Sequence, residues 1–187
     1  MDVVKQLESL QRRIAQRNDL DQSPYFWEHL AIIQTGTSIH CDFYGSRFSD
    51  SYCDLLDTLA HIDVAPRIRS LVFRNPDEGT NGTIEWDLSP LVSTSAEFSQ
   101  LGHFAIQLNQ PSDHNRSIIG TQFDENGVLA KLITKSPNIQ ELIVPSAPNA
   151  EFFNIGERPI RYLNVDAGYD PQNFISNLAE SACFPAA

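Results

Sequence analysis

The sequence predicts an α/β fold, namely a short, irregular solenoid in which a mainly parallel, curved sheet carries helices on its convex face. Three segments share the pattern apolar-x-x-apolar-x-apolar, and they begin at Ile68, Ile139 and Ile160. Each lies close to a stretch with the periodicity of a helix, so strands and helices alternate along the chain. Stacked units of this kind share one continuous core and expose a sheet surface for contacts with other molecules.

The composition is that of a globular protein. With 187 residues, 41% of them hydrophobic and 20% charged, the chain fits one domain that spans residues 1–187. It lacks an apolar run long enough for a membrane span, and its N-terminus lacks the basic start of a secretory signal. The three cysteines show no paired spacing, which favours free thiols in the cytoplasm.

The charge limits the possible partners. The formal net charge is -11, from 13 basic and 24 acidic residues. A nucleic acid or an anionic membrane surface requires a cationic footprint, so we expect neither as a partner. An unknown protein partner remains.

The N-terminal third contains three expected parts. Residues 2–17 form an amphipathic helix whose apolar stripe we expect to pack against the body; a homodimer contact is the alternative. Two short strands, Leu30 to Ile33 and Ser38 to Tyr44, surround Gly36. A helix over 50–63 follows, with Ser49 or Asp50 as its cap. We divide the domain into an N-terminal packing helix (1–20), an irregular first unit (27–66) and a repeat-like array (67–185).

The array alternates strands and helices. Ser89 as cap and Pro90 at the first helical position predict a helix that runs to about residue 99. Residues 109–123 are polar and loop-like, and the connection 146–158 has room for only a turn or a short helical bend. The other expected strands are 67–74, 101–108, 139–145 and 160–166, and the other expected helices are 125–136 and the segment that Asp170-Pro171 opens.

Two motifs carry a resemblance to a known family. Ser136-Pro-Asn-Ile-Gln-Glu-Leu-Ile-Val144 and Pro159-Ile-Arg-Tyr-Leu-Asn-Val-Asp-Ala-Gly168 lie between helical segments, and Ile84 to Leu91 is similar to the same family's helix start. Residues 67–185 thus resemble bacterial leucine-rich-repeat proteins of a ribonuclease-inhibitor-like, cytosolic, uncharacterised family. The asparagine that usually closes the strand motif is absent, since Ala147 and Gly168 stand there. The resemblance implies protein binding without catalytic residues.

The two-residue period of a strand predicts which side chains share the concave face. They form three rows: Ser70, His103, Glu141 and Tyr162; Val72, Ala105, Ile143 and Asn164; Arg74, Gln107, Pro145 and Asp166. Aromatic, charged and apolar side chains together are typical of a contact surface, although an ordinary solvated sheet would look similar. The candidate partner-binding residues are Arg74, His103, Gln107, Glu141, Ile143, Tyr162, Asn164 and Asp166.

Two alternatives have weaker support. A small hydrolase or metal enzyme would be built around His40, Cys41 and His61, but their spacing matches no zinc pattern and no nucleophile signature surrounds the cysteine. We therefore expect no enzymatic activity, no metal and no cofactor. A structural, self-assembling subunit would use the N-terminal stripe and the C-terminal end, although we expect the last helix to cap that end.

Overall fold

The computed structural model describes residues 3–20, 27–77, 82–107, 112–121, 125–166, 170, 172–181 and 183–184. Helices and strands alternate along most of this length. Their order is α1 (Val3–Leu20), β1 (His29–Thr35), β2 (Ser38–Tyr44), α2 (Asp50–Leu59), the 3-10 helix η2 (Ala65–Arg67), β3 (Ile68–Arg74), β4 (Thr83–Trp86), α3 (Ser89–Ser93), β5 (His103–Ile106), β6 (Arg116–Ile119), α4 (Val128–Lys135), β7 (Glu141–Val144), α5 (Ala150–Phe153), β8 (Tyr162–Val165) and α6 (Phe174–Glu180).

The main sheet confirms the expected mixed α/β class with a mostly parallel sheet. It has six strands in the order β1-β2-β3-β5-β7-β8. β1 and β2 form an antiparallel hairpin, and every later strand adds in parallel beside the preceding one. The two remaining strands, β4 and β6, pair in parallel as a small second sheet. Each new strand therefore extends the main sheet in the order of the chain.

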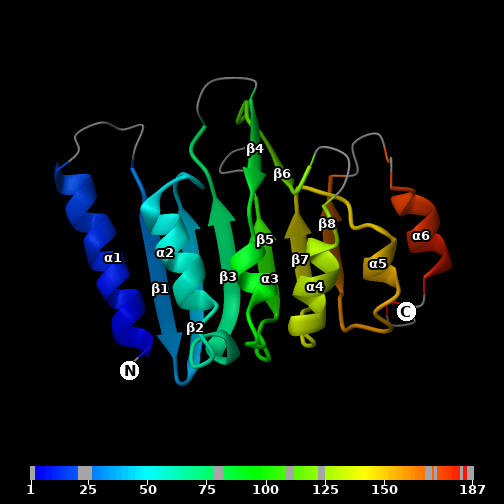
Figure 1. Cartoon of the computed structure of the whole chain (residues 1–187), viewed down its shortest axis with the longest axis horizontal. Coiled ribbons are helices and arrows are strands. Elements are labelled where there is room, and N and C mark those ends of the chain that lie inside the picture. Colours follow the sequence, from blue (N-terminus) through cyan, green and yellow to red (C-terminus); the bar gives the residue numbers. More distant parts are fainter. Residues whose placement is uncertain are drawn as a thin grey trace.

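The helices form one layer beside the main sheet. Each helix from α1 to α5 contacts the next one along the chain, and Figure 1 shows the helices in a row, with α2, α3 and α4 in front of the strands and α1 and α6 at the two ends. In β2 the side chains of Ile39, Cys41 and Phe43 are buried, while those between them are partly exposed. Because side chains alternate across a strand, the core lies on the helix side and the other face of the sheet remains open.

The N-terminal helix packs against the body, as its apolar stripe predicts. Leu7, Leu10 and Ile14 are buried. Two polar side chains of α1 also bind the backbone of β1: Gln11 Nε2 donates to the Leu30 carbonyl oxygen, and Asn18 accepts from the Glu28 N–H and donates to its carbonyl oxygen. These bonds occupy the edge of the sheet, where unpaired backbone groups would attract another strand. The stripe is consequently part of the chain's own core.

Tyr52 joins three elements in the centre of the core. Its ring centroid lies 5.8 Å from that of Phe43, 5.7 Å from Phe73 and 5.5 Å from Trp86. The Tyr52 hydroxyl donates to the Asp87 carbonyl oxygen over 3.0 Å. Aromatic rings in such tilted and edge-on contacts stabilise each other beyond simple burial. They fix α2 against β3 and β4.

Local predictions around the helices are mostly confirmed. Ser49 is the N-cap of α2 and accepts from the Tyr52 N–H. Gly36 has a φ of 61° in the β1–β2 turn, where a left-handed backbone favours glycine. The connection 146–158 contains the short helix α5.

The prediction for residues 89–99 was wrong in its length and in its cap, which was expected to be Ser89. Helix α3 ends at Ser93, and its N-cap is Leu88, while the Asp87 carboxylate accepts from the Ser89 N–H. After Ser93 the chain turns to meet the end of α4, where the Phe98 N–H donates to the Lys135 carbonyl oxygen. The helix therefore ends early because the chain after Ser93 forms a hydrogen bond with a distant segment and does not continue its helical bonds.

The prediction of a loop over 109–123 was also wrong in part. Residues 116–119 form β6, which pairs with β4, and Ile118 and Ile119 are buried. Two consecutive apolar residues are too few to show the two-residue period of a strand, so β6 becomes evident only through its pairing with β4. Residues 108–111 and 122–124 lie outside the described part of the chain.

None of the described helices is both long enough and apolar enough to span a lipid bilayer.

Glu125 offers a test of how the helix layer is held together. It is fully buried, and its carboxylate accepts from the Leu129 N–H over 2.7 Å and from the Asn149 N–H over 3.2 Å. We expect Glu125→Gln to lower the free energy of unfolding by about 1–3 kcal/mol, because the amide group presents a donor where an acceptor is needed. Urea denaturation measures this change. Exposed Glu97→Gln is the matched control, and equal stability of both variants would contradict the assignment.

Candidate functional site

The open face of the main sheet brings the predicted rows together. In the first row Ser70 pairs with His103, His103 with Glu141, and Glu141 with Tyr162. The second row holds Val72, Ala105, Ile143 and Asn164 in the same way. The third row continues beyond the strand ends, where the Gln107 N–H donates to the Phe73 carbonyl oxygen. Strand β2 adds one member to each row, namely His40, Asp42 and Tyr44.

The first row is a chain of polar contacts. Ser70 Oγ and His103 Nδ1 are 2.9 Å apart, and His103 Nε2 lies 4.0 Å from Glu141 Oε2. A shallow hollow of about 260 Å³ lies over these residues, with His40 and Arg69 also in its lining. At the end of the row Tyr162 is 50% exposed. This row therefore presents hydrogen-bonding groups and one exposed aromatic ring.

The second row forms the floor of the face. Val72 is only 8% exposed and Ala105 is fully buried, although they lie on the side of the sheet that faces away from the described helices. Ile143 and Asn164 continue the row toward β8. The middle of this row, from Val72 to Ile143, is apolar and has polar side chains around it, as the buried centres of protein interfaces do.

An ion pair joins the second and third rows. Arg74 makes a two-point contact with the Asp42 carboxylate through Nε and Nη2. Burial raises the pKa of Tyr44 above its ordinary value, and the negative charge of Asp113 raises it further, whereas Arg74 acts in the opposite direction. The negative charge of Asp113 is therefore close enough to the end of β2 to disfavour ionisation of Tyr44.

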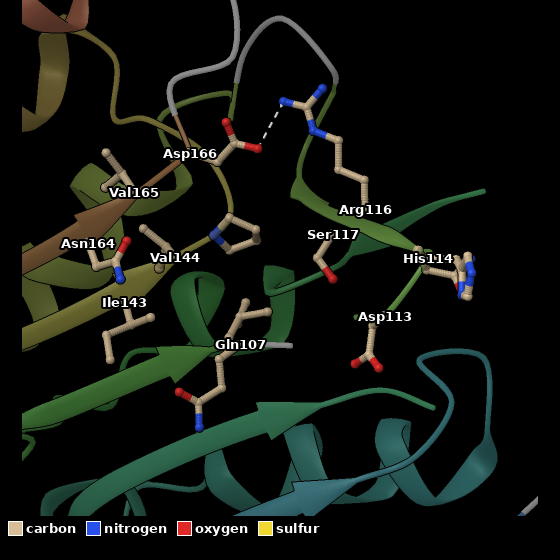
Figure 2. A pocket seen from close by; sticks show the side chains of 13 residues that line it. Gln107, Asp113, His114, Arg116, Ser117, Ile143, Val144, Asn164, Val165 and Asp166 are labelled. Atoms are coloured by element: carbon tan, nitrogen blue, oxygen red, sulfur yellow. Dashed lines mark ion pairs between the residues drawn. The ribbon is translucent and has the colours of Figure 1, made fainter. Parts of the chain in front are cut away.

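A cleft of about 600 Å³ lies beyond the carboxyl ends of β5, β7 and β8. Four of the predicted partner-binding residues line this cleft, namely Gln107, Ile143, Asn164 and Asp166. Figure 2 shows the side chains around this cleft, with Ile143 and Val144 on one side and Asp113 on another. The crevice at the carboxyl ends of parallel strands is the usual place for ligands in open α/β sheets.

The polar side of the cleft comes from a segment that sequence reasoning treated as a loop. Asp113, His114, Arg116 and Ser117 line it, and Arg116 forms an ion pair of 3.2 Å with Asp166, drawn in Figure 2. The Arg116 Nε is buried without a hydrogen-bond partner among the described residues. No sequence motif marks these residues; they reach the cleft because β6 pairs with β4 and carries the preceding segment over the sheet.

Buried hydrogen bonds hold this segment in place. The Trp86 indole N–H donates to Ser117 Oγ over 3.3 Å, and Ser117 Oγ donates to Asn75 Oδ1 over 3.2 Å. The Ile119 N–H donates to Ser146 Oγ over 2.9 Å. Buried polar groups that satisfy one another in this way fix a unique arrangement. The wall of the cleft is therefore tied to β3, β4 and the end of β7.

His114 and Asp77 connect two segments at the outer side of the cleft. His114 Nδ1 lies 2.9 Å from Asp77 Oδ2, and the His114 N–H also donates to this carboxylate. The hydrogen bond to Asp77 and the charge of Asp77 raise the pKa of His114 above its ordinary value of 6.5. The pair joins the segment after β3 to the segment before β6.

The residues of the alternative enzyme hypothesis lie on different surfaces. Cys41 is buried on the helix side of β2, while His40 points to the open face. His61 follows α2 and accepts from the Asp63 N–H through Nδ1. Within the described ranges no cluster of three histidine, cysteine or acidic residues could hold a metal ion. The geometry thus separates the proposed nucleophile from both histidines.

Comparison of the chain with protein-family models, with curated proteins and with solved structures gave no match. The leucine-rich-repeat resemblance of residues 67–185 remains a prediction.

The His114–Asp77 pair predicts a pH dependence. Because the pKa of His114 is raised in the folded state, its contribution to stability is complete below pH 6.5 and is lost as the pH rises through the folded pKa. An NMR titration of the His114 ring should give a pKa above 6.5, and Asp77→Asn should lower it. A titration curve that Asp77→Asn leaves unchanged would refute the pair.

The cysteines predict a difference in reactivity. Burial raises the pKa of the Cys41 thiol to about 12, so the reactive thiolate is scarce, whereas Cys53 is exposed. We expect Ellman's reagent to label Cys53 in the folded protein and Cys41 only after unfolding. Peptide mapping of labelled protein identifies the sites. Rapid labelling of Cys41 in the folded chain would restore it as a candidate nucleophile.

Proposed function

We propose that the chain is a short, irregular leucine-rich-repeat-like solenoid that binds a protein partner through the open, concave face of its sheet. Its place would be the bacterial cytoplasm, and it would act as a scaffold without catalysis of its own. The observation that carries the proposal is the alignment of three rows of side chains on a sheet face that points away from the described helices.

The order of the strands supports the solenoid. From β2 onward each strand of the main sheet lies beside the previous one in parallel, and the connecting helices occupy one side. Repeat proteins are built in this way, because each unit contacts chiefly its neighbours and the stack creates an extended surface. The pairing of β4 with β6 is consistent with two successive units that follow the same path.

The chemistry of the face supports a protein ligand. An exposed aromatic ring, Tyr162, stands at the end of the polar row, and the buried floor lies beside it. Tyrosine and arginine are enriched at the points that contribute most to binding. A large cleft continues the face at the strand ends, so a partner has both a broad surface and a recess to fill.

The test is site-specific photocrosslinking in lysate of the source organism. A benzoylphenylalanine in place of Tyr162 reports on the open face, and one in place of Ile62, which is 63% exposed beyond the end of α2, is the matched control. We expect a crosslinked protein from position 162 and none from position 62. Equal products from both positions, or products from position 62 alone, would count against the open face.

Once a partner is known, Tyr162→Ala should weaken binding by at least about tenfold, because the substitution removes an exposed aromatic ring that the partner would cover. This variant is cleaner than alanine at Arg74 or Asp166, because those side chains form ion pairs with Asp42 and Arg116 within the chain. Ile62→Ala is the control. Unchanged affinity of the Tyr162 variant would remove that residue from the interface.

A further inference from the structure

The two edges of the main sheet differ in what covers them. At the β1 edge, polar side chains of α1 bind the backbone of the strand. At the other edge β8 is the last strand, and no described strand pairs with its outer side. The Tyr162 N–H donates to the Gln140 carbonyl oxygen, so the backbone groups of Tyr162 face β7. Because the backbone groups of successive residues point to opposite edges, those of Leu163 and Val165 face outward.

The core side of β8 is also less covered than that of the strands before it. Leu163 aligns with Leu142 and Phe104, which are fully buried, and Val165 aligns with Val144, which is buried as well. Leu163 and Val165 themselves are only partly buried. Within the described part of the chain, β8 therefore lacks an outer neighbour of the kind that completes the burial of β5 and β7.

An apolar groove of about 350 Å³ lies along this edge. Three residues of β8, two of α6 and one residue near the C-terminal end line it, and five of these six are apolar: Leu163, Asn164, Val165, Phe174, Leu178 and Phe184. Figure 1 shows α6 as the last helix of the row, beyond β8. The groove thus combines a row of outward-facing backbone groups with an apolar wall.

These two features require the same ligand. Backbone N–H and C=O groups along a strand edge are satisfied by another extended main chain, which adds to the sheet as a further strand. The apolar wall is covered by apolar side chains, and a strand presents these at every second position. A helix cannot take this role, because its own backbone groups are already paired within it.

The position of α6 favours a single strand over a second copy of the chain. A two-fold axis at the edge would keep the helix rows of both copies on the same side of the joined sheet. Each α6 lies beyond its own β8, so the two helices would meet over the same stretch of the joint. An extended segment of another protein brings no such helix with it.

We propose that the outer edge of β8 accepts an extended segment of a partner protein as a seventh strand of the main sheet. Its main chain pairs with the backbone of Leu163 and Val165, and its alternate apolar side chains fill the groove against Phe174 and Leu178. This interaction is independent of the proposed function, because it uses the edge of the sheet, whereas the proposed function uses the open face.

The test is an NMR titration of the ¹⁵N-labelled full chain with a blocked heptapeptide of alternating threonine and valine. We expect its binding to slow hydrogen exchange of the Leu163 and Val165 amides at least about tenfold, because both become hydrogen-bonded. The exposed Ile33 amide at the β1 end of the sheet serves as an internal reference and should not change. Binding that leaves the exchange of Leu163 and Val165 unaltered would overturn the proposal.

N-methylated peptides separate strand pairing from apolar adhesion. One version carries N-methyl groups on all threonines and the other on all valines, so each lacks the donors of one edge of the peptide. We expect one version to bind as the unmodified peptide does and the other at least about tenfold more weakly, because only one edge of a strand faces β8. Equal binding of the two versions, or no binding of any peptide, would overturn the proposal.

Variants of α6 place the site in the groove. Leu178→Glu sets a carboxylate in the apolar wall, and we expect it to weaken binding of the unmodified peptide at least about tenfold. Ile175→Glu is the matched control, since Ile175 is 60% exposed on the same helix and does not line the groove. Unchanged amide spectra of β7 verify that both variants are folded. Equal affinity of the two variants would contradict the assignment.

The protein without peptide supplies the last control. If the Leu163 and Val165 amides exchange slowly in the dilute protein, the edge is already paired within the chain and the proposal is wrong. If their protection rises with the concentration of the protein alone, a second copy fills the edge, and the proposed partner segment is wrong. Rapid exchange that is independent of concentration is the result that we expect.

Discussion

The helix layer buries one side of the main sheet far more completely than the other, and the rest of the structure depends on this constraint. The apolar side chains of each strand, such as Phe43 in β2, Phe73 in β3 and Phe104 in β5, point into a core that the row of helices covers. Because side chains alternate along a strand, the residues that face the core also determine which residues lie on the opposite face. A slip of one residue would bury the polar row and expose the phenylalanines, so core packing sets the register of the open surface.

That constraint explains why much of the surface could be predicted. The apolar pattern from Ile68 and from Ile160 places Ser70 and Tyr162 opposite the core, and parallel pairing then aligns them through His103 and Glu141. The hairpin around Gly36 and the cap at Ser49 follow from local chemistry in the same way. Where a residue's position depends on periodicity or on a turn, the sequence contains enough information.

The parts that could not be predicted depend on long-range pairing. Strand β6 has too little periodicity of its own, and it forms because β4 is present beside it. Helix α3 ends early because the chain after Ser93 binds the end of α4, and no local signal marks that contact. Asp113 and Arg116 were missed for the same reason, since their position follows from β6 and from the buried chain of hydrogen bonds through Ser117.

The open face thus consists of two parts that are held in place by different interactions. Its rows are set by the strands and are as rigid as the core beneath them, whereas the polar wall of the cleft is attached through Ser117, Ser146 and the His114–Asp77 pair. Ser117 and Ser146 are buried, whereas His114 is exposed and its pKa is raised by Asp77. Side chains on a rigid sheet lose little freedom when a partner binds, which favours affinity. The outer wall is held in part by a contact that varies with pH, and it borders the cleft that Ile143, Val144 and Val165 line.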